Sequence, residues 1–62
     1  MQFKVIWMRG ETALGTKVFN ELVEATGYAE ENLDGIVKTF GATAVKIISD
    51  DGTPHYLKSL SR

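Results

Sequence analysis

The chain has no cysteine, one histidine and one proline among its 62 residues. Without cysteine it has neither disulfides nor thiolate metal sites, and a single imidazole, His55, excludes sites that need two histidines from one chain. No apolar run approaches the roughly 20 residues that cross a membrane, and the first ten residues lack the pattern of a signal peptide. The sequence therefore predicts a cytoplasmic protein with no bound metal or cofactor.

The composition is typical of a small folded protein. Hydrophobic residues make up 44% of the chain and charged residues 24%, a balance too apolar for a disordered segment. A chain of this length buries only about 60% of the surface that its unfolded form exposes, so it has room for one small core. We expect residues 1–62 to form a single domain.

Alternating apolar residues predict three strands. The first places Phe3, Val5 and Trp7 on one side of the chain. The other two are joined by a turn at residues 50–54, where Asp-Asp-Gly-Thr-Pro breaks the apolar pattern. The predicted strands are residues 2–8, 44–49 and 55–60.

Apolar residues at helical spacing predict two helices, residues 13–26 and 30–40. In the second helix the apolar stripe runs from Leu33 to Phe40. The first helix is expected to stop at Gly27, because glycine tolerates the positive φ of a tight turn between helices.

These elements predict an α+β fold in which a two-helix hairpin packs on a three-stranded antiparallel sheet, in the order β-α-α-β-β. The expected core includes Phe3, Val5, Trp7, Val18, Leu22, Leu33, Ile36, Val37, Phe40, Val45 and Ile47.

The segment 22–36 has the spacing of a helix-turn-helix, with Gly27 between two apolar helical stripes. Together with the strand–turn–strand that follows, residues 18–60 resemble the winged helix-turn-helix family. The resemblance implies a winged-helix-like fold and a small regulatory module that binds duplex DNA as a dimer, without catalytic activity. Its expected DNA contacts are Lys38, Lys46, His55 and Lys58.

A second interpretation starts from the distribution of charge. Between Glu21 and Asp34 there are five acidic residues and no basic one, although the net charge is only −1. These acids repel DNA phosphates, but they suit a non-catalytic interaction module, such as a small inhibitor or adaptor, that docks on a basic partner protein. That interpretation assigns partner binding to Glu30, Glu31 and Asp34, and both interpretations stay open.

Neither a nucleotide site nor a nucleophile is recognisable. The stretch Gly10–Lys17 is close to a phosphate-binding loop, but its lysine follows Thr16 instead of the second glycine, which turns it away from the phosphates. Ser59 and Ser61 have no histidine and acid at a suitable spacing. The sequence therefore predicts a protein that is not an enzyme.

One further expectation concerns the second face of the sheet. If Phe3, Val5 and Trp7 pack on the helices, Ile6 and Met8 lie on the opposite side, where Ile48 joins them. Covering that apolar patch requires a partner or a second subunit, so the sequence also predicts a homodimer.

Overall fold

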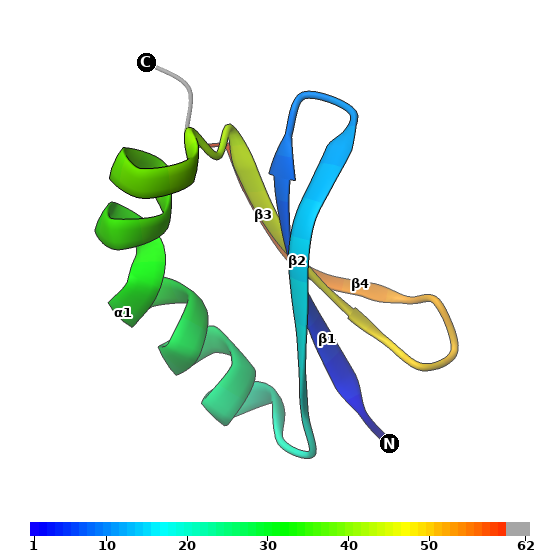
Figure 1. The fold of residues 1–62 in the computed structure, drawn as a ribbon. Helices are drawn as coiled ribbons and strands as arrows, with labels where there is room; N and C mark the ends of the chain where they lie inside the picture. Colours follow the sequence, from blue (N-terminus) through cyan, green and yellow to red (C-terminus); the bar gives the residue numbers. More distant parts are fainter. Residues whose placement is uncertain (60–62) are drawn as a thin grey trace.

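A single helix packs on one face of a four-stranded antiparallel sheet (Figure 1). The computed structural model describes residues 1–59, and the sheet order is β2-β1-β3-β4, so β2 and β4 are the edge strands. The elements along the chain are β1 (Phe3–Arg9), β2 (Thr12–Phe19), α1 (Leu22–Phe40), β3 (Ala44–Ser49) and β4 (Pro54–Ser59).

The central strand β1 is antiparallel to both of its neighbours, β2 and β3. These two strands therefore run parallel to each other, and α1 connects them across one face of the sheet. In the register of the sheet, Val5 lies opposite Lys17 on one side and Ile47 on the other. Directly paired residues point to the same face, so all three point toward α1.

Residues 12–19 form a strand, so the prediction of a helix beginning at residue 13 is wrong. Gly10, with φ 60, opens the two-residue turn after β1, the position at which hairpin turns favour glycine. The β-branched residues that follow suit an extended chain. Val18 and Phe19, which are adjacent apolar residues within that predicted helix, lie on opposite faces of the strand.

The predicted two-helix hairpin is also wrong, because α1 is one helix of 19 residues that continues through Gly27. A glycine inside a helix costs only about 1 kcal/mol relative to alanine, and the fully buried Ala25 and Ala29 pack on either side of it. The helix ends instead at Gly41, whose left-handed backbone lets its N–H donate to the carbonyl of Val37. The bend at Gly27 that supported the winged-helix-like fold is absent.

The three predicted strands are confirmed within a residue or two, as β1, β3 and β4. Leu60, the last residue of the predicted third strand, lies outside the described residues. The sheet gains its fourth strand, β2, from the segment assigned to the first helix.

The core lies between α1 and strands β1 to β3. The predicted burial of Val5, Trp7, Val45 and Ile47 is confirmed, and Phe3, Leu33, Ile36 and Val37 pack against them half-buried. Three predicted members are exposed instead: Val18, Leu22 and Phe40. The small side chains of Ala25, Ala29 and Ala42 take their place.

Substituting Gly27 by alanine tests the continuous helix. An added Cβ meets no heavy atom within 4 Å, so we expect Gly27→Ala to raise the free energy of unfolding by roughly 0.5–1 kcal/mol in chemical denaturation. As a control, Gly41→Ala forces a side chain into the left-handed region and should destabilise the protein by roughly 1–2 kcal/mol. A loss of stability in Gly27→Ala contradicts the helix described above.

A second pair of variants tests the position of the core. Ile47 is fully buried in the middle of β3, so Ile47→Ala should lower the free energy of unfolding by roughly 2–5 kcal/mol. Phe40, at the end of α1, is 52% exposed, so Phe40→Ala should cost clearly less despite removing more atoms. Thermal melts of the two variants, compared with the wild type, decide the order.

Candidate functional site

The face of the sheet opposite α1 is not covered by any element of the described chain. Pairing in the sheet assigns its residues strand by strand, because neighbours in register share a face. Ile6 pairs with Thr16 and with Lys46, and Lys46 pairs in turn with Leu57. We call this surface the open sheet face; it consists of Lys4, Ile6, Met8, Ala13, Thr16, Val18, Ala44, Lys46, Ile48, Pro54, Leu57 and Ser59.

The open sheet face is mainly apolar. Ile6, Met8 and Ile48 lie there together, as the sequence predicted, and are half-buried by their own neighbours in the sheet. The edge strands add Val18, 45% exposed, and Leu57, 75% exposed. Large exposed apolar patches on soluble proteins often coincide with contact sites for other molecules.

The charged residues paired within the open sheet face are both lysines. Lys4 lies on β1 beside Ile48, and Lys46 lies on β3 between Ile6 and Leu57. The lysine on β3 is half-buried at the middle of the face. No aspartate or glutamate is among the residues paired on this face in residues 1–59, but Asp50 continues β3 beyond Ile48 at the end of the face, where its N–H donates to the carbonyl of Gln2 at 3.0 Å.

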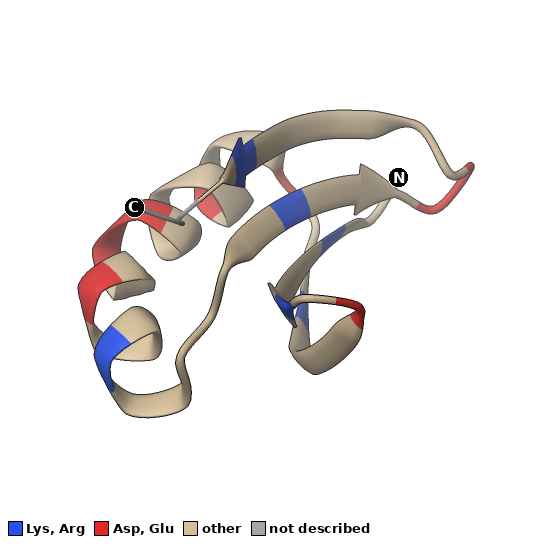
Figure 2. Ribbon diagram, turned by 90° about the horizontal axis from the view of Figure 1, so that it is seen from above, with Lys and Arg blue, Asp and Glu red and all other residues tan. Residues whose placement is uncertain are grey.

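Four of the acidic residues, Glu24, Glu30, Glu31 and Asp34, lie on α1 and face outward, whereas others lie in the hairpin turns (Figure 2). The predicted partner-binding residues Glu30, Glu31 and Asp34 are all exposed and lie within about one helical turn of one another. Glu24 carries the same sign one to two turns earlier. The structure therefore brings together the acidic surface predicted from the sequence, on the side of the molecule away from the open sheet face.

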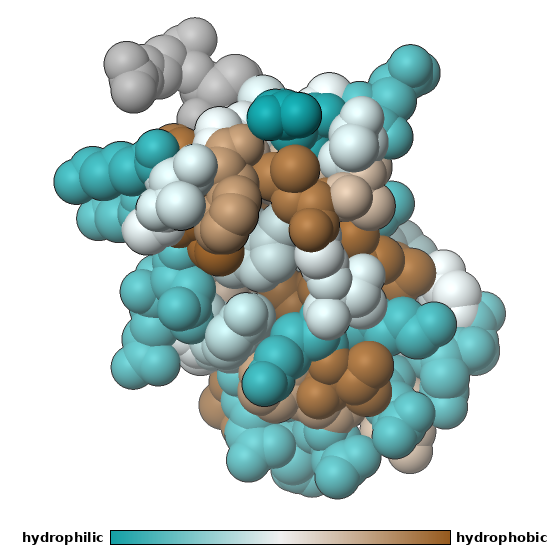
Figure 3. All heavy atoms as spheres, viewed as in Figure 1, coloured by the Kyte–Doolittle hydropathy of each residue, from teal (hydrophilic) through white to brown (hydrophobic). Residues whose placement is uncertain are grey.

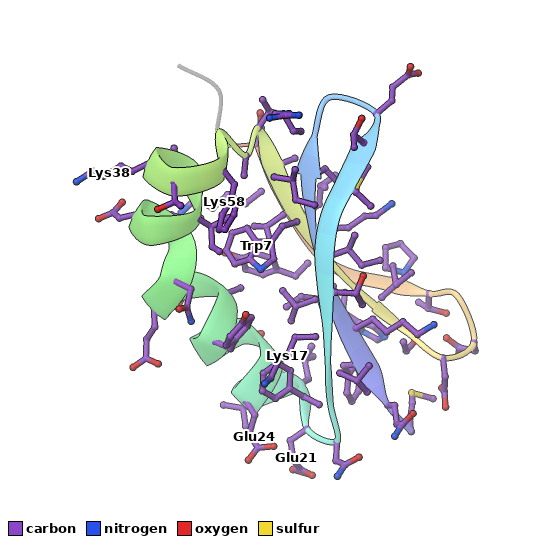
Figure 4. The ribbon with its side chains drawn as sticks, viewed as in Figure 1. Trp7, Lys17, Glu21, Glu24, Lys38 and Lys58 are labelled. Carbon is purple, nitrogen blue, oxygen red and sulfur yellow. The ribbon has the colours of Figure 1, made fainter. Side chains whose placement is uncertain are left out.

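The four residues predicted to contact DNA do not form one surface. Lys38 points outward near the end of α1 (Figure 4), whereas Lys46 lies on the open sheet face. Lys58 pairs with Val45 and so lies on the side of the sheet that carries the helix. His55 is engaged at the hairpin, where its ring contacts Phe3 edge-on at 5.3 Å between centroids.

His55 also belongs to a cluster that resembles a catalytic triad in composition. Its Nε2 lies 3.1 Å from the hydroxyl oxygen of Ser49, and that hydroxyl donates to the carboxylate of Asp51. In a serine hydrolase the acid binds the histidine, and the serine is open to substrate. Here the acid binds the serine, which is only 2% exposed, so the cluster fixes the β3–β4 hairpin and provides no nucleophile.

The hydrogen bonds of this cluster act on the acidity of Asp51. The Ser49 hydroxyl, followed by the Thr53 N–H at 3.0 Å, lowers the pKa of this carboxyl from 3.8 to about 2. Both donors favour the ionised form, and the folded chain therefore holds it more strongly than the unfolded chain does.

This shift predicts a pH dependence of stability. Because the pKa is lower in the folded state, Asp51 stabilises the protein above pH 3.8 and loses this effect as the pH falls toward 2. The wild type should be more stable than Asp51→Asn near neutral pH, and the difference should shrink across that acid range. Urea melts at several pH values measure it, and a difference that persists unchanged at pH 2 contradicts the assignment.

Several residues of the open sheet face were missed from the sequence. Val18 was assigned to a helical core stripe, and Lys4 and Leu57 were given no role. Residues 12–19 do not alternate between polar and apolar, so the sequence holds no clear signal for this strand, which turns Lys17 and Val18 to opposite faces.

Comparison with known proteins gives no significant match to a family model, a curated protein or a solved structure. In residues 1–59, no helix has the length and apolar character needed to span a membrane. Functional inference for this chain therefore starts from its own surfaces.

Proposed function

We propose that this chain is a non-catalytic protein-interaction domain that docks a partner protein on the open sheet face. The observation that carries the proposal is an apolar surface on β1 and β3 that no part of the described chain covers. Each buried apolar group on such a face gains free energy at about 25 cal/mol per Å² once water is removed. A small domain with a one-sided helix has that surface available for binding.

The lysines specify the chemistry of the partner. Burying Lys46 in a contact without a carboxylate leaves a charge without solvent or counter-ion, which is strongly unfavourable. The partner surface is therefore apolar and carries acidic side chains that meet Lys46 and Lys4. The proposed partner is therefore acidic, whereas the acidic residues of the helix led to the expectation of a basic partner.

The same charges disfavour the predicted homodimer through this face. In a two-fold contact the same patch meets itself, so Lys46 of each copy enters an interface that has no acid at its middle. An acidic partner satisfies both lysines, whereas a second copy doubles the uncompensated charge.

Two designed helical peptides provide the test. Both are 18 residues long with leucine along one face; one carries flanking glutamates and the other flanking lysines. We expect the wild type to bind the glutamate peptide at least roughly fivefold more tightly by fluorescence anisotropy at low salt, because its lysines pair with the carboxylates. The variant Lys46→Glu should reverse the preference.

The matched control is Lys38→Glu, which makes the same change of charge on the outer side of α1. It should leave the preference of the wild type in place. Equal effects of the two variants indicate net charge alone and contradict docking on the open sheet face. Sedimentation equilibrium provides a further check. If the wild type forms a dimer that Lys46→Glu dissociates, the partner on the open sheet face is a second copy of the chain, and the proposal of an acidic partner is contradicted.

Duplex DNA is titrated in parallel, because DNA binding stays a prediction from the sequence. A dissociation constant above about 10⁻⁴ M is expected if the protein binds DNA neither specifically nor non-specifically. Tighter binding that Lys46→Glu and Lys58→Glu both weaken would assign the lysines to phosphate contacts and overturn the protein partner.

A further inference from the structure

A groove between α1 and the edge strand β2 lies apart from the open sheet face. It contains a pocket of about 200 Å³. The view in Figure 3 looks onto this edge, and apolar atoms reach the surface between helix and strand. The lining comes from three elements and includes Trp7, Gly15, Lys17, Tyr28, Ile36 and Phe40.

The walls of the pocket are aromatic and aliphatic. The indole of Trp7 lies between the helix and the sheet (Figure 4) and meets the ring of Tyr28 edge-on, at 6.5 Å between centroids. Lys17 points from β2 toward the helix, with its Nζ 6.0 Å from the centre of the same tyrosine ring. At the end of α1, Phe40 exposes half of its surface beside the opening.

A missing side chain keeps the pocket open. Gly15 lies within β2 opposite Trp7, on the side that faces the helix, and an added Cβ there meets no heavy atom within 4 Å. Its backbone does not have the positive φ that requires glycine. A glycine inside a strand is unfavourable for the strand itself and marks either a bulge, such as the register shift next to Gly15, or a place where another molecule approaches closely.

The pocket lies beside an unpaired edge of the sheet. In residues 1–59, β2 has only β1 as a neighbour; its pairing is regular from Gly15 to Phe19 and shifts register next to Gly15, between Trp7 and Met8. The other edge strand, β4, begins with Pro54, which has no N–H, and its register shifts at the same end. The stretch of β2 from Gly15 to Phe19 therefore presents a regular row of backbone groups to an incoming strand.

The pocket also holds an unsatisfied donor. Trp7 is 3% exposed, and its indole N–H has no acceptor among the residues that the structure describes. A buried donor without an acceptor costs roughly 1–3 kcal/mol.

A cavity of about 150 Å³ with apolar walls binds a benzene molecule, so this pocket has room for an aromatic ring or a branched aliphatic group.

We propose that this groove binds an extended peptide segment, which adds to β2 as a further strand and inserts one aromatic or branched aliphatic side chain into the pocket. Backbone hydrogen bonds to the free edge supply affinity, and the pocket selects the inserted residue. Because alternate residues of an added strand point toward α1, only every second side chain is selected. The site uses β2 and α1 and does not depend on docking at the open sheet face.

The proposal is tested with seven-residue peptides whose ends are acetylated and amidated. Each peptide consists of threonine except at its central residue, which is varied. The peptide with central phenylalanine should bind at least about tenfold more tightly than the one with central alanine, because only the former buries a large apolar group. Hydrogen exchange should slow in β2 and not in β4. Gly15→Val fills the pocket from the strand side and should weaken the phenylalanine peptide by more than about tenfold.

The control variant is Gly35→Ala, on the exposed side of α1, where an added Cβ also meets nothing within 4 Å. It should bind the phenylalanine peptide as the wild type does. Unchanged affinity in a folded Gly15→Val overturns the pocket. Should Gly15→Val not fold, Phe40→Ser at the rim replaces it, with a loss of affinity expected and none contradicting the proposal.

Methylated peptides test the strand addition without any protein variant. Two versions of the phenylalanine peptide are made, each methylated on every second backbone nitrogen. In one version the methyl groups block the N–H groups that face β2, and in the other they block the N–H groups that face away from it. Only the first version should lose binding. Equal binding of both methylated peptides shows that the ring enters the pocket without strand pairing, and overturns the proposal.

Discussion

One helix is narrower than a sheet of four strands, and this difference in width determines which surfaces of the protein stay in contact with solvent. A helix with its side chains is about 10 Å across, whereas four strands at about 4.8 Å spacing span more than 14 Å. Ala25 and Ala29, both fully buried, bring α1 close to the centre of the sheet. One helix in that position covers the core of one face and leaves the other face and both edges in contact with solvent.

The parts of the fold that depend on local patterns were predictable from the sequence. Alternation identified β1, β3 and β4, and glycine correctly marked the end of α1 at Gly41. Gly27 has no such role, because the cost of one glycine in a helix is small beside the packing of its neighbours on the sheet. The strand β2 was missed because Val18, Leu22 and Ala25 also fit a helical spacing, and only the tertiary structure decides between the two periods.

The surfaces were predictable in part for the same reason. Ile6, Met8 and Ile48 were correctly assigned to the face away from the helix, since strands alternate whatever their partners are. The contribution of Val18 required knowing that β2 exists. The groove depends on Trp7, Gly15 and Tyr28, which come from three elements and meet only in the folded chain. The open sheet face thus follows from the register of paired strands, whereas the pocket forms only through tertiary packing and could not be predicted from the sequence.

The placement of β1 between two strands from opposite parts of the chain has a kinetic consequence. The β1–β2 and β3–β4 hairpins each join neighbouring segments, so each closes only a short loop. Pairing β1 with β3 brings together groups such as Thr43 and Met8, which are 35 positions apart. We therefore expect the encounter of the two hairpins, and not the closing of either one, to limit the rate of folding.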